Sequence, residues 1–261
     1  MHSNQAVMEP YGGFLWGPVA DIGCFSLLTM NDMEKHRAES FFTKEPETVE
    51  WIRSFTCGKF LDVGANVGVY SLFAAGLHKK MTVYSFEPVF QNYSRLLDNI
   101  RVNSFSNIKP FHCAIGNRTG LTNLYLPTSG VADSGAQIDE PVNDKNERFN
   151  PSEEQLCVQT TVDALFSLVG NIDYIKIDVD GRESTILGAA KLALQSARSV
   201  LVECNTDRLS LANLSGFMKE HRQLPDPRFN NLKDHSSNRR GGNPVNVVFT
   251  NAALINTNAD I

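Results

Sequence analysis

Short apolar runs alternate with helical periodicities along most of the chain. The runs that predict strands are residues 60–63, 81–86, 108–114, 121–126, 158–161, 172–178, 199–203 and 245–250. Apolar residues recurring every three or four positions predict helices over 46–58, 67–77, 90–103, 162–169, 183–195 and 206–219. Strands that alternate with helices predict an α/β fold with a mainly parallel, doubly wound sheet, to which the terminal strand would add as an antiparallel edge.

A length of 261 residues fits a single α/β domain with some decoration. Residues 1–45 carry glycines among aromatic residues, which predicts loops and short strands lying over a main domain at 46–261. Residues 128–155 are rich in Gly, Pro, Asn, Asp and Glu and show almost no periodicity. A loop of that length is usually either functional or disordered, so this segment is predicted to be part of a substrate lid or a plain insertion.

The turn between the strand at 60–63 and the following helix carries two glycines. Gly64 and Gly68 are separated by three residues, and Asp62 lies two positions before the first glycine. Glycine lets backbone approach a ligand closely, and a helix N-terminus presents unpaired N–H groups. The dinucleotide fingerprint needs Gly-x-Gly-x-x-Gly, so this spacing argues against an NAD-linked oxidoreductase. It suits a positively charged ligand without pyrophosphate, and S-adenosylmethionine is such a ligand.

The next strand, at 81–86, stops at Glu87 and Pro88. Proline fixes the break, and the Glu87 carboxylate is left at the carboxyl end of the strand, where open α/β sheets bind ligands. Glu87 lies 23 residues beyond Gly64, a distance that suits an acid binding ribose hydroxyls. Both S-adenosylmethionine and NAD carry such a ribose, so this acid predicts a nucleoside without choosing between them.

Three acids follow the strand at 172–178: Asp178, Asp180 and Glu183. Residues two apart on an extended chain point the same way, so the two aspartates would both face the ligand crevice if extension persists through the turn. A different reading is structural, because Asp180-x-x-Glu183 before a helix has the form of a capping box and Lys176 could form a buried ion pair. Nothing in the spacing requires a metal, and none is assigned.

Composition narrows the class of protein further. A net charge of -5 argues against nonspecific nucleic-acid binding, although a local basic patch stays open. The cysteines are scattered without a Cys-x-x-Cys pair and are predicted to be buried thiols in a reducing compartment: Cys24, Cys57, Cys113, Cys157 and Cys204. No apolar run approaches the roughly 18 residues of a membrane span, and no signal peptide is visible, so we expect a cytoplasmic protein without a membrane partner.

Five segments together resemble the FkbM family of S-adenosylmethionine-dependent methyltransferases. They are Leu61-Asp-Val-Gly-Ala-Asn-Val-Gly68, Ser85-Phe-Glu-Pro88, Ala114-Ile-Gly-Asn117, Thr160-Thr-Val-Asp-Ala-Leu165 and Lys176-Ile-Asp-Val-Asp-Gly-Arg-Glu183. The resemblance implies a Rossmann-like, seven-stranded methyltransferase fold and methyl transfer to a hydroxyl oxygen of a sugar, glycan or natural product. One departure is visible, because the family usually has Asp-Val-Glu-Gly-x-Glu where this chain has the shorter Asp180.

The resemblance implies a cofactor half at about 60–117, an acceptor-side half at about 156–250 and a candidate lid at 128–155. The residues that it assigns to S-adenosylmethionine are Asp62, Gly64, Asn66, Gly68, Glu87, Pro88, Cys113, Ala114 and Asp178. The glycines would pass beside the methionine part, and Asp62 would order the loop or take the ammonium through water. Asn66 would contact the ligand or cap the helix, Glu87 would bind the ribose diol, and Cys113 and Ala114 would flank the adenine.

An alcohol acceptor must lose its proton, so a nearby carboxylate or histidine is expected as general base. Asp178 is the first candidate, Asp180 the second and His235 the alternative. His235 belongs to a polar, partly basic loop at 221–243, which would either meet an acidic sugar or be solvated. The expected partner is a small molecule or glycan with a free hydroxyl, not a nucleic acid. A non-catalytic nucleoside-binding or scaffold domain is the competing class.

Overall fold

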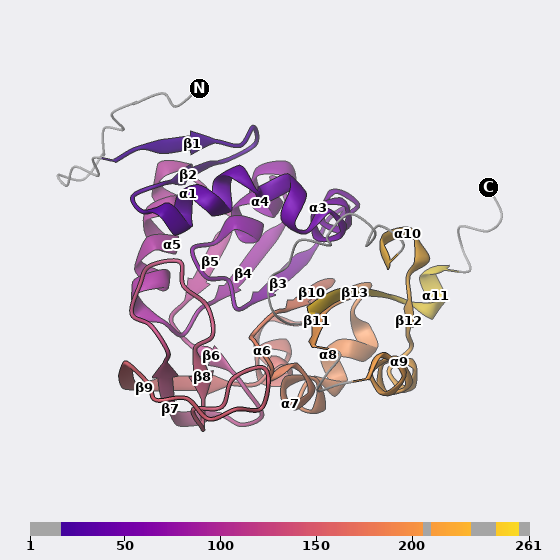
Figure 1. Cartoon of the computed structure of the whole chain (residues 1–261). Helices are drawn as coiled ribbons and strands as arrows, with labels where there is room; N and C mark the ends of the chain where they lie inside the picture. Colours follow the sequence, from indigo (N-terminus) through magenta and orange to yellow (C-terminus); the bar gives the residue numbers. More distant parts are fainter. Residues whose placement is uncertain (1–16, 206–209, 231–243, 256–261) are drawn as a thin grey trace.

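A seven-stranded sheet forms the centre of the computed structural model, which describes residues 17–205, 210–230 and 244–255 (Figure 1). Its strand order is β12-β13-β11-β10-β3-β4-β5. The strands are β3 (Lys59–Val63), β4 (Thr82–Phe86), β5 (Ile108–Phe111), β10 (Tyr174–Ile177), β11 (Ser199–Asn205), β12 (Gln223–Pro225) and β13 (Pro244–Asn251). From β5 to β11 every neighbouring pair is parallel. The predicted Rossmann-like, mainly parallel fold is therefore confirmed.

The terminal strand β13 is antiparallel, as predicted, but it lies one position inside the edge. It pairs with β11 on one side and with β12 on the other, where Leu224 lies opposite Thr250. The segment 221–243 was expected to be a loop, and β12 was missed because three residues are too few to show an alternating pattern.

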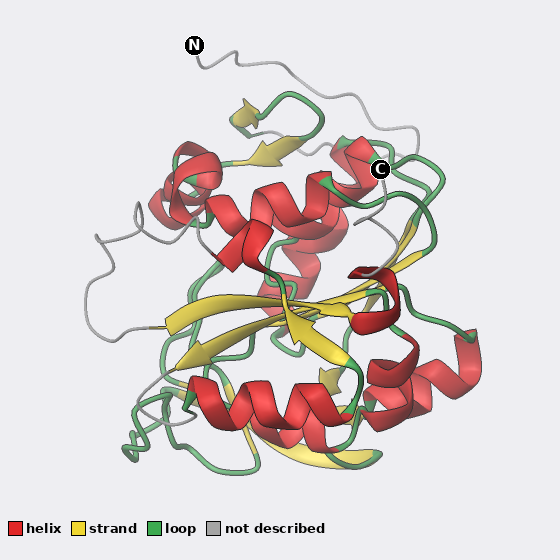
Figure 2. Cartoon of the chain, turned by 90° about the vertical axis from the view of Figure 1, so that its right-hand side faces the viewer, coloured by secondary structure: helices red, strands yellow, loops and turns green. Residues whose placement is uncertain are grey.

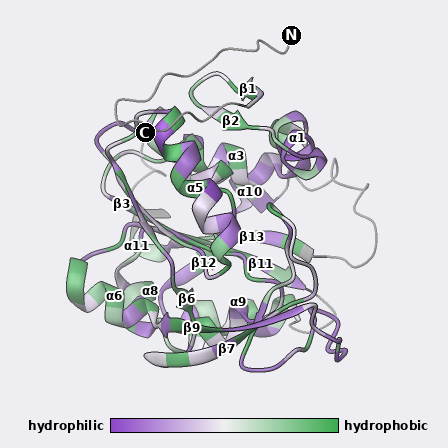
Figure 3. Cartoon of the chain, turned by 90° about the vertical axis from the view of Figure 1, so that its left-hand side faces the viewer, coloured by the Kyte–Doolittle hydropathy of each residue, from purple (hydrophilic) through white to green (hydrophobic). Residues whose placement is uncertain are grey.

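Helices cover both faces of the sheet, so the molecule has three layers (Figure 2). On one side lie α3 (Pro46–Arg53), α4 (Val69–Leu77), α5 (Phe90–Val102) and α10 (Pro227–Asn230); on the other lie α6 (Val162–Val169), α7 (Glu183–Gly188), α8 (Lys191–Ser196) and α9 (Leu211–Glu220). The short helix α11 (Ala252–Ile255) follows β13. Hydrophobic and hydrophilic residues occur together along α5, as expected of a helix with one buried face (Figure 3).

Several helix bounds differ from the predictions. The helix expected at 183–195 is two helices, with a break at Ala189 and Ala190. The helix expected from residue 67 begins only at Val69, since Gly68 before it has a left-handed φ of 92°. The helix expected at 46–58 ends at Arg53, and of the helix expected at 206–219, residues 206–209 lie outside the described residues.

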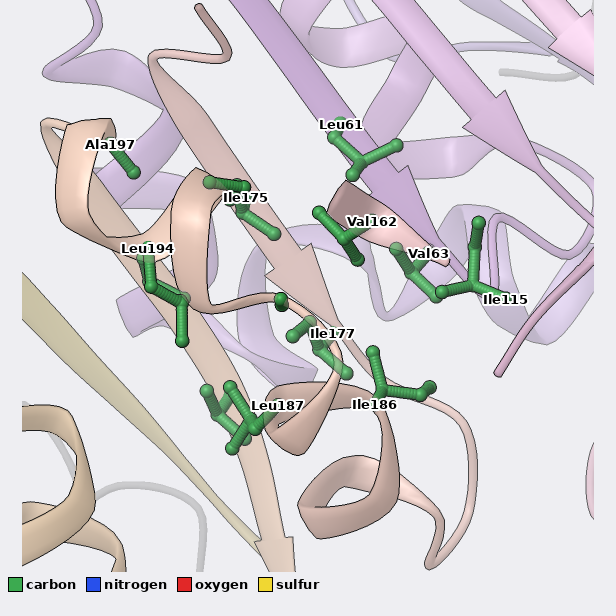
Figure 4. Close-up of a cluster of buried hydrophobic side chains, with 14 of the residues drawn as sticks. Leu61, Val63, Ile115, Val162, Ile175, Ile177, Ile186, Leu187, Leu194 and Ala197 are labelled. Carbon is green, nitrogen blue, oxygen red and sulfur yellow. The ribbon is translucent and has the colours of Figure 1, made fainter. Parts of the chain in front are cut away.

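Alternating side chains of the strands divide the core between the two faces. Leu61 and Val63 of β3 and Ile175 and Ile177 of β10 pack toward α6, α7 and α8 (Figure 4). Residues of the opposite register, including Phe60, pack toward α3 and α4. Because both faces are covered, these strands are apolar almost throughout, and this is why the sequence showed them so clearly.

A second, four-stranded sheet is inserted between β5 and β10. It consists of β6 (Ala114–Ile115), β7 (Gly120–Leu126), β8 (Gln137–Ile138) and β9 (Glu153–Thr160), in the order β6-β9-β7-β8. The strand predicted at 108–114 is therefore split between two sheets. The structure also places β8 and the start of β9 inside 128–155, so that segment is not wholly loop.

The N-terminal segment contains β1 (Val19–Asp21), β2 (Ser26–Leu28), α1 (Asp32–Glu39) and α2 (Phe41–Lys44). The short strands were expected but the two helices were not. In α1 the buried residue is Glu34, which forms a capping box with Asn31 instead of adding to an apolar stripe. Residues 1–16 lie outside the described residues.

Two further expectations can be compared with the structure. Cys113, Cys157 and Cys204 are buried as predicted, but Cys24 is only partly buried and Cys57 is exposed. Within the described ranges, none of the helices combines the length and the apolar composition that a membrane crossing needs.

Candidate functional site

Gly64 forms the turn at which β3 leaves the sheet. Its φ is 79°, and a Cβ here would overlap the carbonyl oxygen of Asp178, so only glycine fits. The turn is anchored on the other side by β4, since the N–H groups of Gly64 and Ala65 donate to the carbonyl oxygen of Phe86 at 3.0 and 2.9 Å. The turn is thereby fixed between the ends of β4 and β10, and the glycine itself adds no side chain there.

Three adjoining hollows lie at the carboxyl ends of the strands, and Gly64 lines all of them. The first, of about 360 Å³, is mostly apolar and includes Phe86, Ala114 and Ile115. The second, of about 400 Å³, contains Glu87. The third, of about 750 Å³, is lined by many polar groups; its lining residues include Arg37, Lys44, Glu45, Tyr70, Ser134, Lys176, Asp178, Asp180 and Glu203. These volumes include space open to solvent.

Glu87 lies at the end of β4 with 4% of its surface exposed. Its Oε2 accepts the N–H of Asn66 at 2.7 Å and its Oε1 accepts the N–H of Val89 at 2.9 Å. Burial raises the pKa of the carboxyl to about 7, although these hydrogen bonds favour the ionised form. The Asn92 side chain also hydrogen-bonds the carboxyl, and a carboxylate has about four lone-pair sites, so the group can still accept a hydrogen bond from a ligand. Pro88 lines the first and second hollows.

Residues 130–136, which we call the cover segment, lie against the second hollow. Asn92 accepts the N–H of Ala132 at 2.7 Å and donates to the carbonyl oxygen of Asp133 at 3.2 Å. Asn66 donates to the same oxygen at 2.7 Å, and Arg37 donates to the carbonyl oxygen of Ala132. The cover segment is part of the candidate lid at 128–155 and is held against the pocket by side chains from α1, α5 and the Gly64 turn.

Asn66 has no helix-capping role. Its φ is 52°, and its Oδ1 accepts the N–H of Val67, whereas the N-cap of α4 is Gly68. A Cβ on Gly68 would overlap Leu96, and Gly68 lines none of the three hollows. Packing and the left-handed φ therefore account for this glycine, and its proposed role beside the cofactor has no support from the pocket lining.

Asp62 and Cys113 lie behind the site. Asp62 is 1% exposed, accepts a hydrogen bond from Ser71 Oγ at 2.6 Å and lies 3.9 Å from Lys176 Nζ; burial raises its pKa. Burial also raises the pKa of the Cys113 thiol to about 11. Neither residue lines a described hollow, whereas Ala114 lines the first. Asp62 is thus placed to order the turn, one of the two roles expected for it.

Lys176 and Asp178 form the buried ion pair that the sequence left as an alternative. Lys176 is 1% exposed, and its Nζ donates to Asp178 Oδ2 at 2.6 Å and lies 5.0 Å from the ring centre of Tyr70. Burial opposes ionisation of Asp178, but the lysine outweighs it and lowers the pKa of the carboxyl to about 2. Asp178 is therefore ionised, oriented and a lining residue of the third hollow.

The capping box, which the sequence left as an alternative role for Asp180 and Glu183, is not formed. The N-cap of α7 is Arg182 and has no side-chain bond; Glu183 Oε1 instead accepts the N–H groups of Val179 at 3.2 Å and Gly181 at 3.0 Å. Asp180 has a φ of 56°, so extension does not persist through the turn. It nevertheless lines the third hollow with Asp178, and its Oδ2 accepts the N–H of Gly135 in the cover segment at 2.8 Å.

The sequence did not single out several groups that line the third hollow. Glu203 ends the apolar run at 199–203, and an acid at the end of a strand is a pattern from which a site residue could have been predicted. Arg37, Lys44 and Glu45 come from the N-terminal segment and carried no comparable signal, because only the tertiary fold brings them to the strand ends. His235 lies outside the described residues. Among the residues that are described, no group of three or more His, Cys, Asp and Glu is arranged to hold a metal ion.

A model of the methyltransferase FkbM domain matches residues 62–225. The chain belongs to this family. Within the FkbM family region lie the Gly64 turn, Glu87 and the acids after β10, whereas Arg37 and Lys44 lie outside it. The matched domain is a methyltransferase domain, and S-adenosylmethionine is accordingly the cofactor.

Similar proteins carry related names at low identity. "Methyltransferase 1" of Beauveria bassiana is 22% identical over 139 residues, which cover 49% of this chain and 56% of that protein. A SAM-dependent methyltransferase from Agrobacterium tumefaciens has a TM-score of 0.49 at 10% identity, covering 93% of this chain and 72% of that one. M. jannaschii TYW2, crystallised with AdoMet, has a TM-score of 0.45 at 12% identity, with 91% and 88% covered.

The solved structures also include an rRNA methylase from Streptococcus thermophilus, with a TM-score of 0.39 at 12% identity over 79% of this chain and 92% of that one. Structural likeness at this level identifies no acceptor. The expectations of a hydroxyl acceptor, of no nucleic-acid partner and of a cytoplasmic location therefore stay predictions.

Proposed function

We propose that this protein transfers a methyl group from S-adenosylmethionine to a hydroxyl oxygen of a sugar, glycan or natural product. The observation that carries the proposal is that three hollows meet at Gly64. The first is apolar, the second contains the Glu87 carboxylate and the third is larger and polar. An adenine ring, a ribose diol and an amino-acid tail with a reactive methyl require these surroundings in this order.

The residues present fit that cofactor. Ala114, Ile115 and Ile138 would pack on the adenine, and Glu87 would accept hydrogen bonds from the ribose hydroxyls. The methionine part would lie beside the Gly64 turn, because the glycine has no side chain and its backbone lines the hollow directly. When bound, S-adenosylmethionine supplies a methyl group on a positively charged sulfur.

The third hollow would hold the methionine part of the cofactor beside Gly64 and the acceptor in the remaining space. Its lining combines the Tyr70 ring with cationic Arg37 and Lys44 and with several carboxyl groups, so it offers both donors and acceptors. A polyhydroxylated molecule uses both kinds of partner. The N-terminal segment supplies part of this wall, which gives the decoration at 1–45 a role in selecting the acceptor.

Asp178 is the best-placed proton acceptor among the residues that the structure describes. Its ionised carboxylate lines the hollow, and Lys176 fixes its position at 2.6 Å. Asp180 ranks second, since burial raises its pKa and no cation is paired with it among the described ion pairs, so its ionised form is less favoured than that of Asp178. Fixing the acceptor hydroxyl against an oriented carboxylate supplies positioning as well as a base.

Calorimetric titration with S-adenosylmethionine, S-adenosylhomocysteine and NAD in parallel tests the proposal. We expect the first two to bind and NAD not to bind. Binding would be followed by a screen of methyl glycosides and hydroxylated natural products, read by formation of S-adenosylhomocysteine. Failure of all three ligands to bind would overturn the proposal in favour of a scaffold domain, and methylation of RNA alone would overturn the acceptor class.

A further inference from the structure

Glu203 and Asp178 are neighbours across two parallel strands. β10 and β11 pair in register, with Ile177 opposite Val202, so the next residues along both strands are these two acids. Their side chains hydrogen-bond to each other, and both line the third hollow. Two carboxyl groups can share such a bond only if one of them carries a proton, because ionised carboxylates are acceptors alone.

The two carboxyl groups have different charged neighbours. On the side of Asp178 lie Lys176 at 2.6 Å and Lys44, and burial is outweighed there by these cations. Among the described residues, the charges that act most strongly on Glu203 are those of other acids: Asp178, Glu45, Asp180 and Glu183. Burial and these acids raise the pKa of Glu203 well above its ordinary value, whereas that of Asp178 is lowered to about 2. The shared proton therefore resides on Glu203, as in other sites where two acids lie together.

We propose that Glu203 and Asp178 act as one unit, which holds a single proton in the resting protein, releases it when the cationic cofactor binds and then takes the proton of the acceptor hydroxyl. The proposal rests on the proposed function. The inference goes beyond that function because it adds Glu203 as a catalytic residue. It also links the charge of the Glu203–Asp178 pair to the charge of the ligand beside Gly64.

The step balances in atoms and charge. The O–H bond of the acceptor breaks and its proton goes to the doubly ionised pair. The acceptor oxygen forms a bond to the methyl carbon, and the electron pair of the broken S–C bond stays on sulfur. A pair of charge minus two, a cationic sulfonium and a neutral alcohol thus become a pair of charge minus one, a neutral thioether and a methyl ether. The resting state of the pair is restored.

Proton release on cofactor binding tests this without an acceptor. Binding of S-adenosylmethionine and of S-adenosylhomocysteine would be measured by calorimetry at pH 7 in phosphate and in Tris, whose ionisation heats differ. Both ligands carry the same amino-acid tail, so proton changes on that tail cancel in the comparison. We expect the sulfonium ligand to release about one proton more than the thioether, because only its charge favours a second ionised carboxyl in the coupled pair.

The variant Glu203→Gln keeps a hydrogen-bonding side chain without a titratable proton. We expect it to bind both ligands with equal proton release. Glu140→Gln is the matched control, since Glu140 is 62% exposed and lies outside the hollows, and it should keep the wild-type difference. The proposal would be overturned if the wild type released equal numbers of protons with the two ligands. It would also be overturned if Glu203→Gln kept the wild-type difference in proton release. Failure of both ligands to bind the wild type would instead overturn the proposed function.

A measurement on the wild type covers the case in which Glu203→Gln does not fold. Infrared difference spectra of protein with ¹³C-labelled glutamate carboxyl groups report a protonated glutamate directly. We expect its C=O band in the free protein and with S-adenosylhomocysteine, and its loss with S-adenosylmethionine. Because Glu87 and Glu183 have pKa values raised to about 7 and add bands of their own, the readout is the difference between the spectra with S-adenosylmethionine and with S-adenosylhomocysteine. Equal C=O intensity with the two ligands would contradict the proposal.

Discussion

Arg37 on α1 donates hydrogen bonds from Nε at 3.1 Å and from Nη2 at 2.6 Å to the carbonyl oxygen of Ala132, 95 residues further along the chain. Asn31 donates from the start of the same helix to the carbonyl oxygen of Val131 at 3.1 Å. The N-terminal segment therefore lines the third hollow and also holds the cover segment against the second.

Replacing Arg37 with Ala should loosen the cover segment. Charge-assisted hydrogen bonds are worth roughly 1.5–3 kcal/mol, so we expect faster amide hydrogen exchange at 130–136 and several-fold weaker binding of S-adenosylhomocysteine. Arg53→Ala is the matched control, because Arg53 pairs with Glu50 on the surface of α3. Equal exchange rates in the two variants would show that Arg37 does not hold the segment.

Gly64→Ala should be far more damaging than Gly23→Ala. Both glycines have a left-handed φ, 79° and 95°, and an alanine in this conformation is strained by about 1–2 kcal/mol. A Cβ at Gly23 meets nothing within 4 Å, whereas one at Gly64 overlaps the Asp178 carbonyl oxygen. We expect urea unfolding to show a loss at Gly64 clearly above that at Gly23, with loss of cofactor binding only at Gly64. Similar losses would mean that the turn can relax.

Glu87→Ala should abolish cofactor binding and leave the fold intact. The carboxylate lines the second hollow at the end of β4, and its removal deprives the ribose hydroxyls of the acceptor proposed for them. Circular dichroism would check the fold, and calorimetric titration would check binding of S-adenosylmethionine. Tight binding by a folded variant would disprove the ribose assignment.

Lys176→Met should destabilise the protein by roughly 1.5–3 kcal/mol, because the partly buried Asp178 carboxylate loses its charge-assisted hydrogen bond to Lys176. Adding Asp178→Leu should recover most of that loss, since the second change removes the orphaned carboxylate. Free energies of unfolding in urea for the two single variants and the double variant complete the cycle. If the losses simply add, the two residues are not coupled through their 2.6 Å contact.

Stability should fall as the pH rises from about 4.5 to about 7. Burial raises the pKa of Glu183 from 4.5 to about 7, so folding favours its protonated form, and the stabilisation present below pH 4.5 is lost as the carboxyl ionises in the folded protein. At 1.36 kcal/mol per unit this is about 3 kcal/mol. Glu183→Gln retains an oxygen for the N–H groups of Val179 and Gly181, so its unfolding free energy should vary less over this range. Glu87, Glu203, Asp62 and Asp180, whose pKa values are also raised, contribute in the same direction to the remaining slope.

The central strands and the Gly64 turn could be predicted because their constraints are local. A strand covered on both faces is apolar along most of its length, as β11 is at Val200, Leu201 and Val202, and a left-handed turn against a neighbouring strand requires glycine. Glu87 was predictable because a proline marks the end of its strand. These features cover the cofactor half of the site.

The acceptor side was less predictable because tertiary contacts create it. The pairing of Glu203 with Asp178 follows from the register of β10 and β11, which no single strand's sequence specifies. Helix α1 has no apolar stripe, because its buried residue Glu34 is paired at 2.9 Å with Arg95 from α5. Arg37 consequently gave no sign that it would reach the pocket.

The four-stranded sheet pairs with none of the seven central strands, although it supplies Ala114 and Ile138 to the first hollow and is joined to the cover segment. Such an insertion can change in length and sequence while the central sheet keeps its hydrogen bonds. Variation among related enzymes is therefore expected to concentrate in this module, where a new acceptor preference can evolve without a new fold.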